Sequence, residues 1–225
     1  MLPFPRLFEY GNVIDNSAIL DIDFTDAALG STAVVDKAGS QFVLMRTTVG
    51  VVEYDTDIGA NVYNMKMSNG YYRSVDPIMG TKLDLTRYSN FEIQCRYKAA
   101  ASPIQNIFEV GNYDSRRITG YVCQLNQFAS THYQMFVDWG ENYARVLGAG
   151  VNTGQWNTVT VRYYRGDKIT LHDTITGVTQ SYPAYTLVSN SSQYVGLFGS
   201  YVNGDIGGNT YSFVGKIQYL KIRRI

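Results

Sequence analysis

The chain has 225 residues, of which 45% are hydrophobic and 17% charged. This composition excludes a disordered chain and is sufficient for a core without disulfides or metals. Lysine plus arginine equals aspartate plus glutamate at 19 each, so no strong field attracts nucleic acid or an anionic membrane surface, and such a neutral chain tends to associate.

Residues 1–17 predict an extended N-terminal arm. The steps Leu2-Pro3 and Phe4-Pro5 keep the backbone out of helix. Prolines and charges also interrupt the apolar run that a signal peptide needs, so we expect synthesis in a cytoplasm and no membrane insertion. We expect the arm to pack on its own domain or on a partner, through apolar residues outside any alternating pattern: Leu2, Phe4, Leu7, Phe8 and Tyr10.

The segment Leu20–Asp26 follows the arm and predicts an opening edge strand. Its aspartates at 21 and 23 are two residues apart, so they belong to the polar face of such a strand. Strict two-residue alternation recurs at 91–97, 132–137, 158–163 and 168–172. The positions expected to face inward are Phe91, Ile93, Cys95, Tyr97, Tyr133, Met135, Val137, Val159, Val161, Tyr163, Ile169 and Leu171.

Glycine- and asparagine-containing turns separate these segments, and no helix of ordinary length is predicted. One turn, Arg165-Gly166-Asp167, is also the tripeptide of some integrin ligands. A hairpin glycine between two alternating strands is the favoured interpretation. The pattern as a whole predicts a sandwich or barrel, because the crossover helices of a parallel sheet are missing.

Two turn segments have the chemistry of sugar recognition. An aromatic ring can stack on a sugar while amides and carboxylates bind its hydroxyls. The candidate carbohydrate-binding residues are Asp138, Trp139, Glu141 and Asn142 in the first segment, and Tyr201, Asn203, Asp205 and Asn209 in the second. The second segment could also supply oxygen ligands to calcium, but its single carboxylate predicts weak affinity. No metal or cofactor is expected.

The end of the chain, residues 211–225, changes its buried parity. Phe213, Gly215, Ile217 and Tyr219 share one parity, whereas Leu220 and Ile222 have the other. A strand that changes its buried face requires a bulge, expected near Tyr219-Leu220. Gly215 predicts a close approach by a neighbouring chain or ring.

Three groups of residues resemble the laminin-G-like, concanavalin-type jelly-roll family. In order, they lie around Asp36 and Gly39, in residues 82–99, and after residue 150. The last group is the richest, with Gly154, Trp156, Val159, Val161, Gly166, Ile169, Leu171, Asp173, Gly177, Gly196, Phe213, Gly215, Ile217 and Ile222. The resemblance implies an all-β, two-sheet antiparallel jelly-roll sandwich. We expect one domain over 18–225 after the arm, with a division near residue 88 as the alternative.

Glycan hydrolases of this superfamily resemble one another in a glutamate-x-aspartate-x-x-glutamate strand motif, which the sequence lacks. The nearest acidic segment is Leu20–Asp26, where Asp26 is five residues from Asp21 and is expected to lie past the end of the strand. His132 and His172 have no nucleophile motif beside them. No catalytic residue is therefore expected, and a hydrolase is the last of three alternatives.

The favoured function is a non-enzymatic structural or decoration component of a virus particle, most plausibly a bacteriophage. Its lectin-like sandwich would bind host-surface glycans, and its arm would contact other virion proteins in a homo-oligomer or symmetric assembly. The second alternative is a stand-alone lectin. The sequence leaves open the particle, the glycan, and whether Cys95 and Cys123, expected to be reduced, are neighbours.

Overall fold

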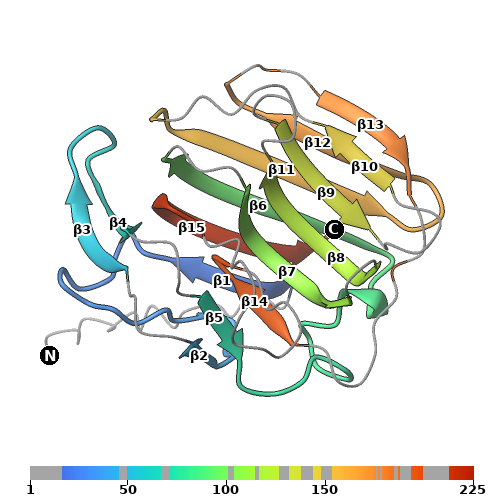
Figure 1. Ribbon diagram of the computed structural model, residues 1–225, viewed down its shortest axis with the longest axis horizontal. Helices are drawn as coiled ribbons and strands as arrows, with labels where there is room; N and C mark the ends of the chain where they lie inside the picture. The colour runs from blue at the N-terminus through green and yellow to red at the C-terminus, as the bar shows by residue number, and fades with distance from the viewer. Residues whose placement is uncertain are drawn as a thin grey trace, which may run out of the picture.

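Alternating apolar and polar positions place much of the chain in strands, which pair into two antiparallel sheets (Figure 1). The computed structural model describes residues 17–45, 50–66, 71–100, 104–114, 117–126, 132–137, 144–147, 154–175, 177, 179–184, 187, 194–199 and 213–225. For residues 104, 105 and 111–147 within these ranges it describes the backbone alone. The helical content of these ranges is one 3₁₀ turn, η1 (Leu85–Arg87). Of the predicted arm, only Ser17 is described.

Sheet A has eight strands among the described residues. Seven of them follow the order β13 (Thr179–Pro183), β12 (Lys168–Asp173), β11 (Asn157–Tyr164), β6 (Asn90–Ala99), β15 (Gly215–Arg224), β4 (Ala60–Met65) and β3 (Val51–Asp55). The eighth strand, β1 (Ala18–Asp23), pairs with residues 219–223 of β15. The β3–β4 hairpin is joined to the sheet through only three residues of β15, 215–217.

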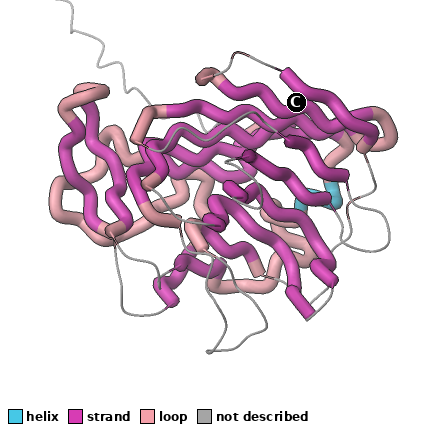
Figure 2. Tube along the Cα trace, turned by 45° about the horizontal axis from the view of Figure 1, so that its top comes forward, coloured by secondary structure: helices cyan, strands magenta, loops and turns pink. Residues whose placement is uncertain are grey.

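Sheet B has seven strands in the described part of the chain. Their order is β10 (Ala144–Leu147), β9 (His132–Val137), β8 (Arg117–Asn126), β7 (Ile104–Asp114), β14 (Val195–Leu197), β5 (Tyr71–Ser74) and β2 (Phe42–Met45). Figure 2 shows the two sheets stacked as layers, with the β3–β4 hairpin at one end. The all-β, two-sheet antiparallel sandwich predicted from the sequence is therefore confirmed.

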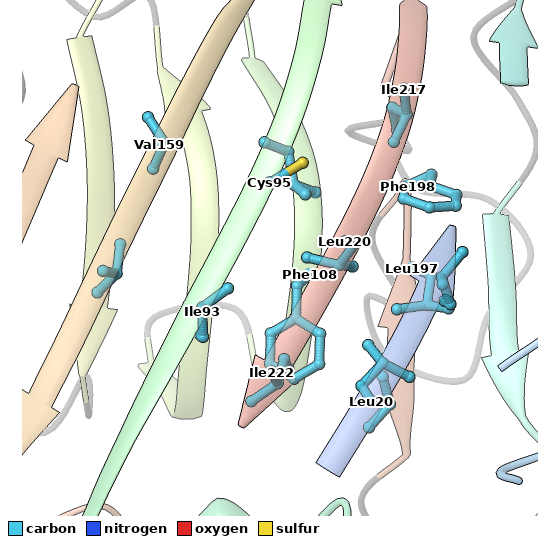
Figure 3. Packing of buried hydrophobic residues seen from close by; sticks show 14 of the residues in the cluster. Leu20, Ile93, Cys95, Phe108, Val159, Leu197, Phe198, Ile217, Leu220 and Ile222 are labelled. Atoms are coloured by element: carbon cyan, nitrogen blue, oxygen red, sulfur yellow. The ribbon is translucent and has the colours of Figure 1, made fainter. Parts of the chain in front are cut away.

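The predicted inward positions fill the space between the sheets wherever side chains are described. Phe91, Ile93, Cys95 and Tyr97 on β6 are each at most 1% exposed. They pack with buried residues of β11, β12 and β15, and with Phe108 and Leu197 from sheet B (Figure 3). Full burial of one such side chain contributes about 1.5–3 kcal/mol, so this layer is the main source of stability. Cys95 is buried in sheet A, whereas Cys123 belongs to β8 of sheet B, so the two are not cross-strand neighbours.

The predicted bulge is present in β15, one residue before its expected place. Ile217 is opposite Tyr97 and Tyr219 is opposite Arg96, so Gln218 is the extra residue. Gln218 is held there because its backbone oxygen accepts a hydrogen bond from the N–H of Phe24, at 3.0 Å. The bulge turns Tyr219 to the outer face of sheet A and keeps Leu220 and Ile222 in the core.

Candidate functional site

The sugar-binding residues predicted from the sequence lie outside the described residues. Asp138, Trp139, Glu141 and Asn142 follow β9, and Tyr201, Asn203, Asp205 and Asn209 follow β14. Pairing through β8 and β7 makes β14 antiparallel to β9, so the two strands end at opposite ends of sheet B. The arm residues Leu2, Phe4, Leu7, Phe8 and Tyr10 also lie outside the described residues.

The acidic segment of β1 is a set of ion pairs on the outer face of sheet A. Lys221 of β15 lies 2.7 Å from Asp23 and 3.7 Å from Asp21. Burial raises the pKa of Asp23, but hydrogen bonds from Lys221 and Thr25 outweigh this effect and lower the pKa below its usual value. A general acid requires a raised pKa. The geometry of β1 therefore favours a structural role for its carboxylates.

A buried acid and a buried amide are hydrogen-bonded to each other in β7, where the register shifts between Asn106 and Phe108. Asn106 and Glu109 are 2% and 6% exposed, and the Asn106 amide donates a hydrogen bond to the Glu109 carboxylate.

An open cleft of about 400 Å³ lies at one end of sheet A, where β4 and β6 end and β15 begins. Small residues form part of its lining: Ala99, Ala100, Gly154 and Gly215. Their backbones are tied together, since Gly154 donates to the oxygen of Ala99 and Ala100 donates to that of Val214, both at 2.9 Å. The lining is therefore a rigid, low surface that a ligand can approach closely.

Gly215 is essential to this surface. Its φ is +135°, and a Cβ atom built there would lie 2.3 Å from the backbone oxygen of Lys98. Gly154 also has a positive φ, +83°, but a Cβ atom there would meet nothing within 4 Å. The sequence predicted the close approach at Gly215, and the structure confirms it, with backbone rather than a ring as the neighbour.

Long polar side chains complete the lining of the cleft: Asn64, Lys98 and Lys216. Lys98 lies 2.6 Å from Asp57. Lys216 lies 2.7 Å from Asp55 and 3.0 Å from Glu53. These acids belong to the β3–β4 hairpin, so the hairpin is anchored to the sheet at the wall of the cleft.

The ion pairs of Lys216 favour the charged forms of this lysine and of its two acids, Asp55 and Glu53. Hydrogen bonding to Asp55 raises the pKa of Lys216 against the opposing effect of burial. Burial raises the pKa of Asp55, but hydrogen bonds from Lys216 and from the backbone N–H of Asp57 lower it overall. The pKa of Glu53 is lowered in the same way, with Asn64 and Lys216 as its donors.

Trp156 lies beside this network, immediately before β11. Its indole approaches Asp55 closely enough to contribute to the lowered pKa of that carboxyl, although Nε1 has no well-aligned hydrogen-bond acceptor. The guanidinium carbon of Arg96 lies 5.8 Å from the centroid of the Trp156 ring. Gly154 and Trp156 both contribute to the sequence resemblance described above. The structure places Gly154 in the lining of the cleft and Trp156 beside Asp55, the partner of Lys216.

The remaining chemistry-bearing residues form no second centre in the described part of the chain. His172 Nδ1 lies 3.0 Å from Thr179 Oγ1 on the neighbouring strand. No group of three or more His, Cys, Asp or Glu side chains in the described ranges is arranged to hold a metal ion. Among these residues, no helix is long and apolar enough to cross a membrane.

No protein-family model matches the chain, and no curated protein matches it in sequence. Solved structures do match it in fold. The receptor-binding domain of botulinum neurotoxin mosaic serotype C/D superposes with a TM-score of 0.58 at 16% identity, over 93% of this chain and 48% of that one. The binding domain of botulinum neurotoxin DC, in complex with rat synaptotagmin II, gives 0.59 at 10% identity and the same coverage. The chain thus spans about half the length of the toxin domains.

A third structure matches over nearly its full length. It is domain 4 of AbnA, a GH43 extracellular arabinanase from Geobacillus stearothermophilus, in complex with arabinotriose. The TM-score is 0.59 at 13% identity, with 92% of each chain covered. At such identities the similarity establishes the fold alone, a β-sandwich that this chain shares with the toxin domains and with the arabinotriose-bound domain.

Proposed function

We propose that this chain is a non-enzymatic carbohydrate-binding sandwich and that the cleft beside Trp156 is its binding site. The observation that carries the proposal is the cleft, in which hydrogen-bonding side chains stand beside a surface of small residues. Its volume lies within the range of about 300–1,000 Å³ typical of ligand sites. The fold shared with an arabinotriose-bound domain supports the same class of ligand.

A hydrolase is the weaker candidate on the same observations. Hydrolysis of a glycosidic bond requires two carboxylates that flank the bond. The acids of β1 are paired with Lys221, and the buried Glu109 of β7 accepts a hydrogen bond from the Asn106 amide. Neither strand therefore provides the acid and the base that the reaction needs.

A glycan array on the full chain tests the binding function, with Gly154→Asn as the cleft variant. Asparagine tolerates positive φ, and the open space around Gly154 accepts its side chain at the cleft. We expect Gly154→Asn to remove binding and Gly166→Asn to retain it, because Gly166 is a turn glycine between β11 and β12 with the same open surroundings. Equal binding by both variants would contradict the assignment of the cleft.

The segments that contain Trp139 and Tyr201 are proposed as additional sugar contacts, on the sequence argument alone. The variant Trp139→Ala tests the first of these segments independently of the cleft. If the loop around Trp139 binds sugar, this variant should lose glycan signals that Gly154→Asn retains. An unchanged array for Trp139→Ala would remove that loop from the proposal.

The proposed setting is the surface of a bacteriophage particle, with the sandwich displayed and the arm in contact with other virion proteins. The apolar arm sequence and the zero net charge support this setting, since both favour association. Purified particles should contain the chain, and deletion of residues 1–16 should prevent its attachment and its self-association in light scattering. A truncated chain that attaches like the full chain would contradict the role of the arm.

A further inference from the structure

The two lysines of the cleft are arranged against an ordinary rule of sheet stability. Lys98 of β6 and Lys216 of β15 are directly opposite each other in the strand register. Like charges in directly opposite positions destabilise a sheet. Such local violations are expected where a site requires them.

Each lysine is compensated in a different way. Lys216 is held by Asp55, whose side chain is 2% exposed, and by Glu53. Lys98 is held by Asp57, whose side chain is 57% exposed. An exposed ion pair is weak because water competes with it. The Lys98 ammonium has three N–H donors, so it can bind a second acceptor while it keeps Asp57 or exchange one for the other.

The charged residues of the cleft lining favour ligands that carry negatively charged hydrogen-bond acceptors. They are the two lysines, whereas the three acids that compensate them do not line the cleft. Asn64 donates its amide to Glu53. The described lining therefore contains lysine side chains from two adjacent strands and no carboxylate. An oxyanion bound there would relieve the repulsion between Lys98 and Lys216.

We propose that the cleft selects acidic saccharides, whose carboxylate or sulfate group binds between Lys98 and Lys216 while the sugar ring lies over Gly154 and Gly215. This inference rests on the proposed function and specifies its ligand. The oxyanion is the shared chemistry, and uronic acids and sulfated sugars are its two sources.

The test is calorimetric titration of the full chain with four probes: an oligogalacturonate, a sulfated oligosaccharide, a neutral arabino-oligosaccharide of similar length, and inorganic sulfate. We expect at least one acidic saccharide to bind about tenfold more tightly than the neutral one, as charge-assisted hydrogen bonds allow. The preference should weaken as salt is added. Which acidic saccharide binds identifies the source, and binding of inorganic sulfate alone would overturn the saccharide requirement.

Lys98→Gln is the decisive variant, because it removes the charge and leaves only the exposed Asp57 without its partner. It should abolish the preference for the acidic saccharide. Lys37→Gln is the matched control, since Lys37 also pairs with an exposed aspartate, Asp26, away from the cleft. Circular dichroism checks that both variants fold.

The outcomes separate the inference from the proposed function. Equal affinity for neutral and acidic saccharides, unchanged in Lys98→Gln, would overturn the inference and leave carbohydrate binding intact. Acidic binding that survives both Lys98→Gln and Gly154→Asn would also overturn it, because the site would lie elsewhere. Absence of binding to every saccharide, on the array and in solution, would overturn both.

Discussion

Gly215 is constrained both by its backbone conformation and by its surroundings. Its φ of +135° is rarely adopted by other residues, and the oxygen of Lys98 occupies the space that a Cβ atom needs. We predict that Gly215→Ala lowers the free energy of unfolding by about 3 kcal/mol, from backbone strain and overpacking together. Urea unfolding of the two proteins measures the difference.

Gly166 provides the matched control at the same scale. Its φ is +72°, but a Cβ atom there would meet nothing within 4 Å. Gly166→Ala should therefore cost about 1 kcal/mol, from the left-handed backbone alone. If Gly215→Ala and Gly166→Ala lower the free energy of unfolding equally, the close approach of the Lys98 oxygen does not add to the loss at Gly215.

A pair of buried tyrosines predicts the pH dependence of stability in alkali. The hydroxyl groups of Tyr63 on sheet A and Tyr72 on sheet B are hydrogen-bonded, with 2.6 Å between their oxygens. Tyr72 also donates a hydrogen bond to the backbone oxygen of Thr32, at 2.7 Å. Burial raises the pKa of both tyrosines, and the Tyr72 hydroxyl raises that of Tyr63 further. In the unfolded chain both ionise near pH 10.

Because the folded pKa values are raised, the contribution of this pair is complete below about pH 10 and is lost as the pH increases above it. We predict that the free energy of unfolding decreases above about pH 10. The decrease should be less steep in the double variant Tyr63→Phe/Tyr72→Phe, in which Tyr163, whose pKa burial also raises, still contributes. Denaturant titrations between neutral and alkaline pH make the comparison, and identical slopes would refute the assignment.

The β3–β4 hairpin is the element whose position depends most on charge. Three residues of β15 pair with β4, and ion pairs of Asp55 and Glu53 with Lys216 supplement them. We predict that Asp55→Asn lowers stability by about 1–3 kcal/mol, because it leaves a half-buried ammonium with a weaker partner. Hydrogen exchange should show the loss of protection first in β3 and β4.

Asp57→Asn is the control for the hairpin, since its carboxylate is exposed and its pair with Lys98 should contribute less than about 1 kcal/mol. The lowered pKa values of Asp55 and Glu53 give the pH dependence. Their contribution is present above the unfolded values near pH 4 and is lost as the pH falls through the folded ones. This account would be contradicted if, as the pH is lowered, the wild type began to unfold at the same pH as Asp55→Asn or at a higher one.

For the whole molecule, the proposed boundary before residue 18 can be tested by truncation. The described sandwich begins at Ser17, whose oxygen accepts a hydrogen bond from Arg224, and at Ala18, the first residue of β1. We predict that the chain of residues 17–225 unfolds within a few degrees of the full chain, because the two-sheet core remains complete. Differential scanning calorimetry measures this, and a large fall in Tm would place the arm within the fold.

The sequence by itself determined an all-β sandwich or barrel, because alternation specifies which face of each strand is buried whatever its partner. The resemblance to the jelly-roll family predicted two sheets, which the structure shows. The sequence also predicted the inward residues of β6, β11 and β12, the hairpin at Gly166, and a bulge near the parity change in β15. The bulge is one residue earlier than expected, since the position depends on contact between Gln218 and Phe24.

Only the tertiary structure decided where the cleft lies. Lys98, Gly154 and Lys216 come from segments far apart in the chain, and each alone resembles an ordinary surface or turn residue. Strand register makes the two lysines neighbours, and the acids that compensate them come from a hairpin earlier in the chain. Sequence patterns report the environment of single positions, whereas a cleft is a property of pairings between distant strands.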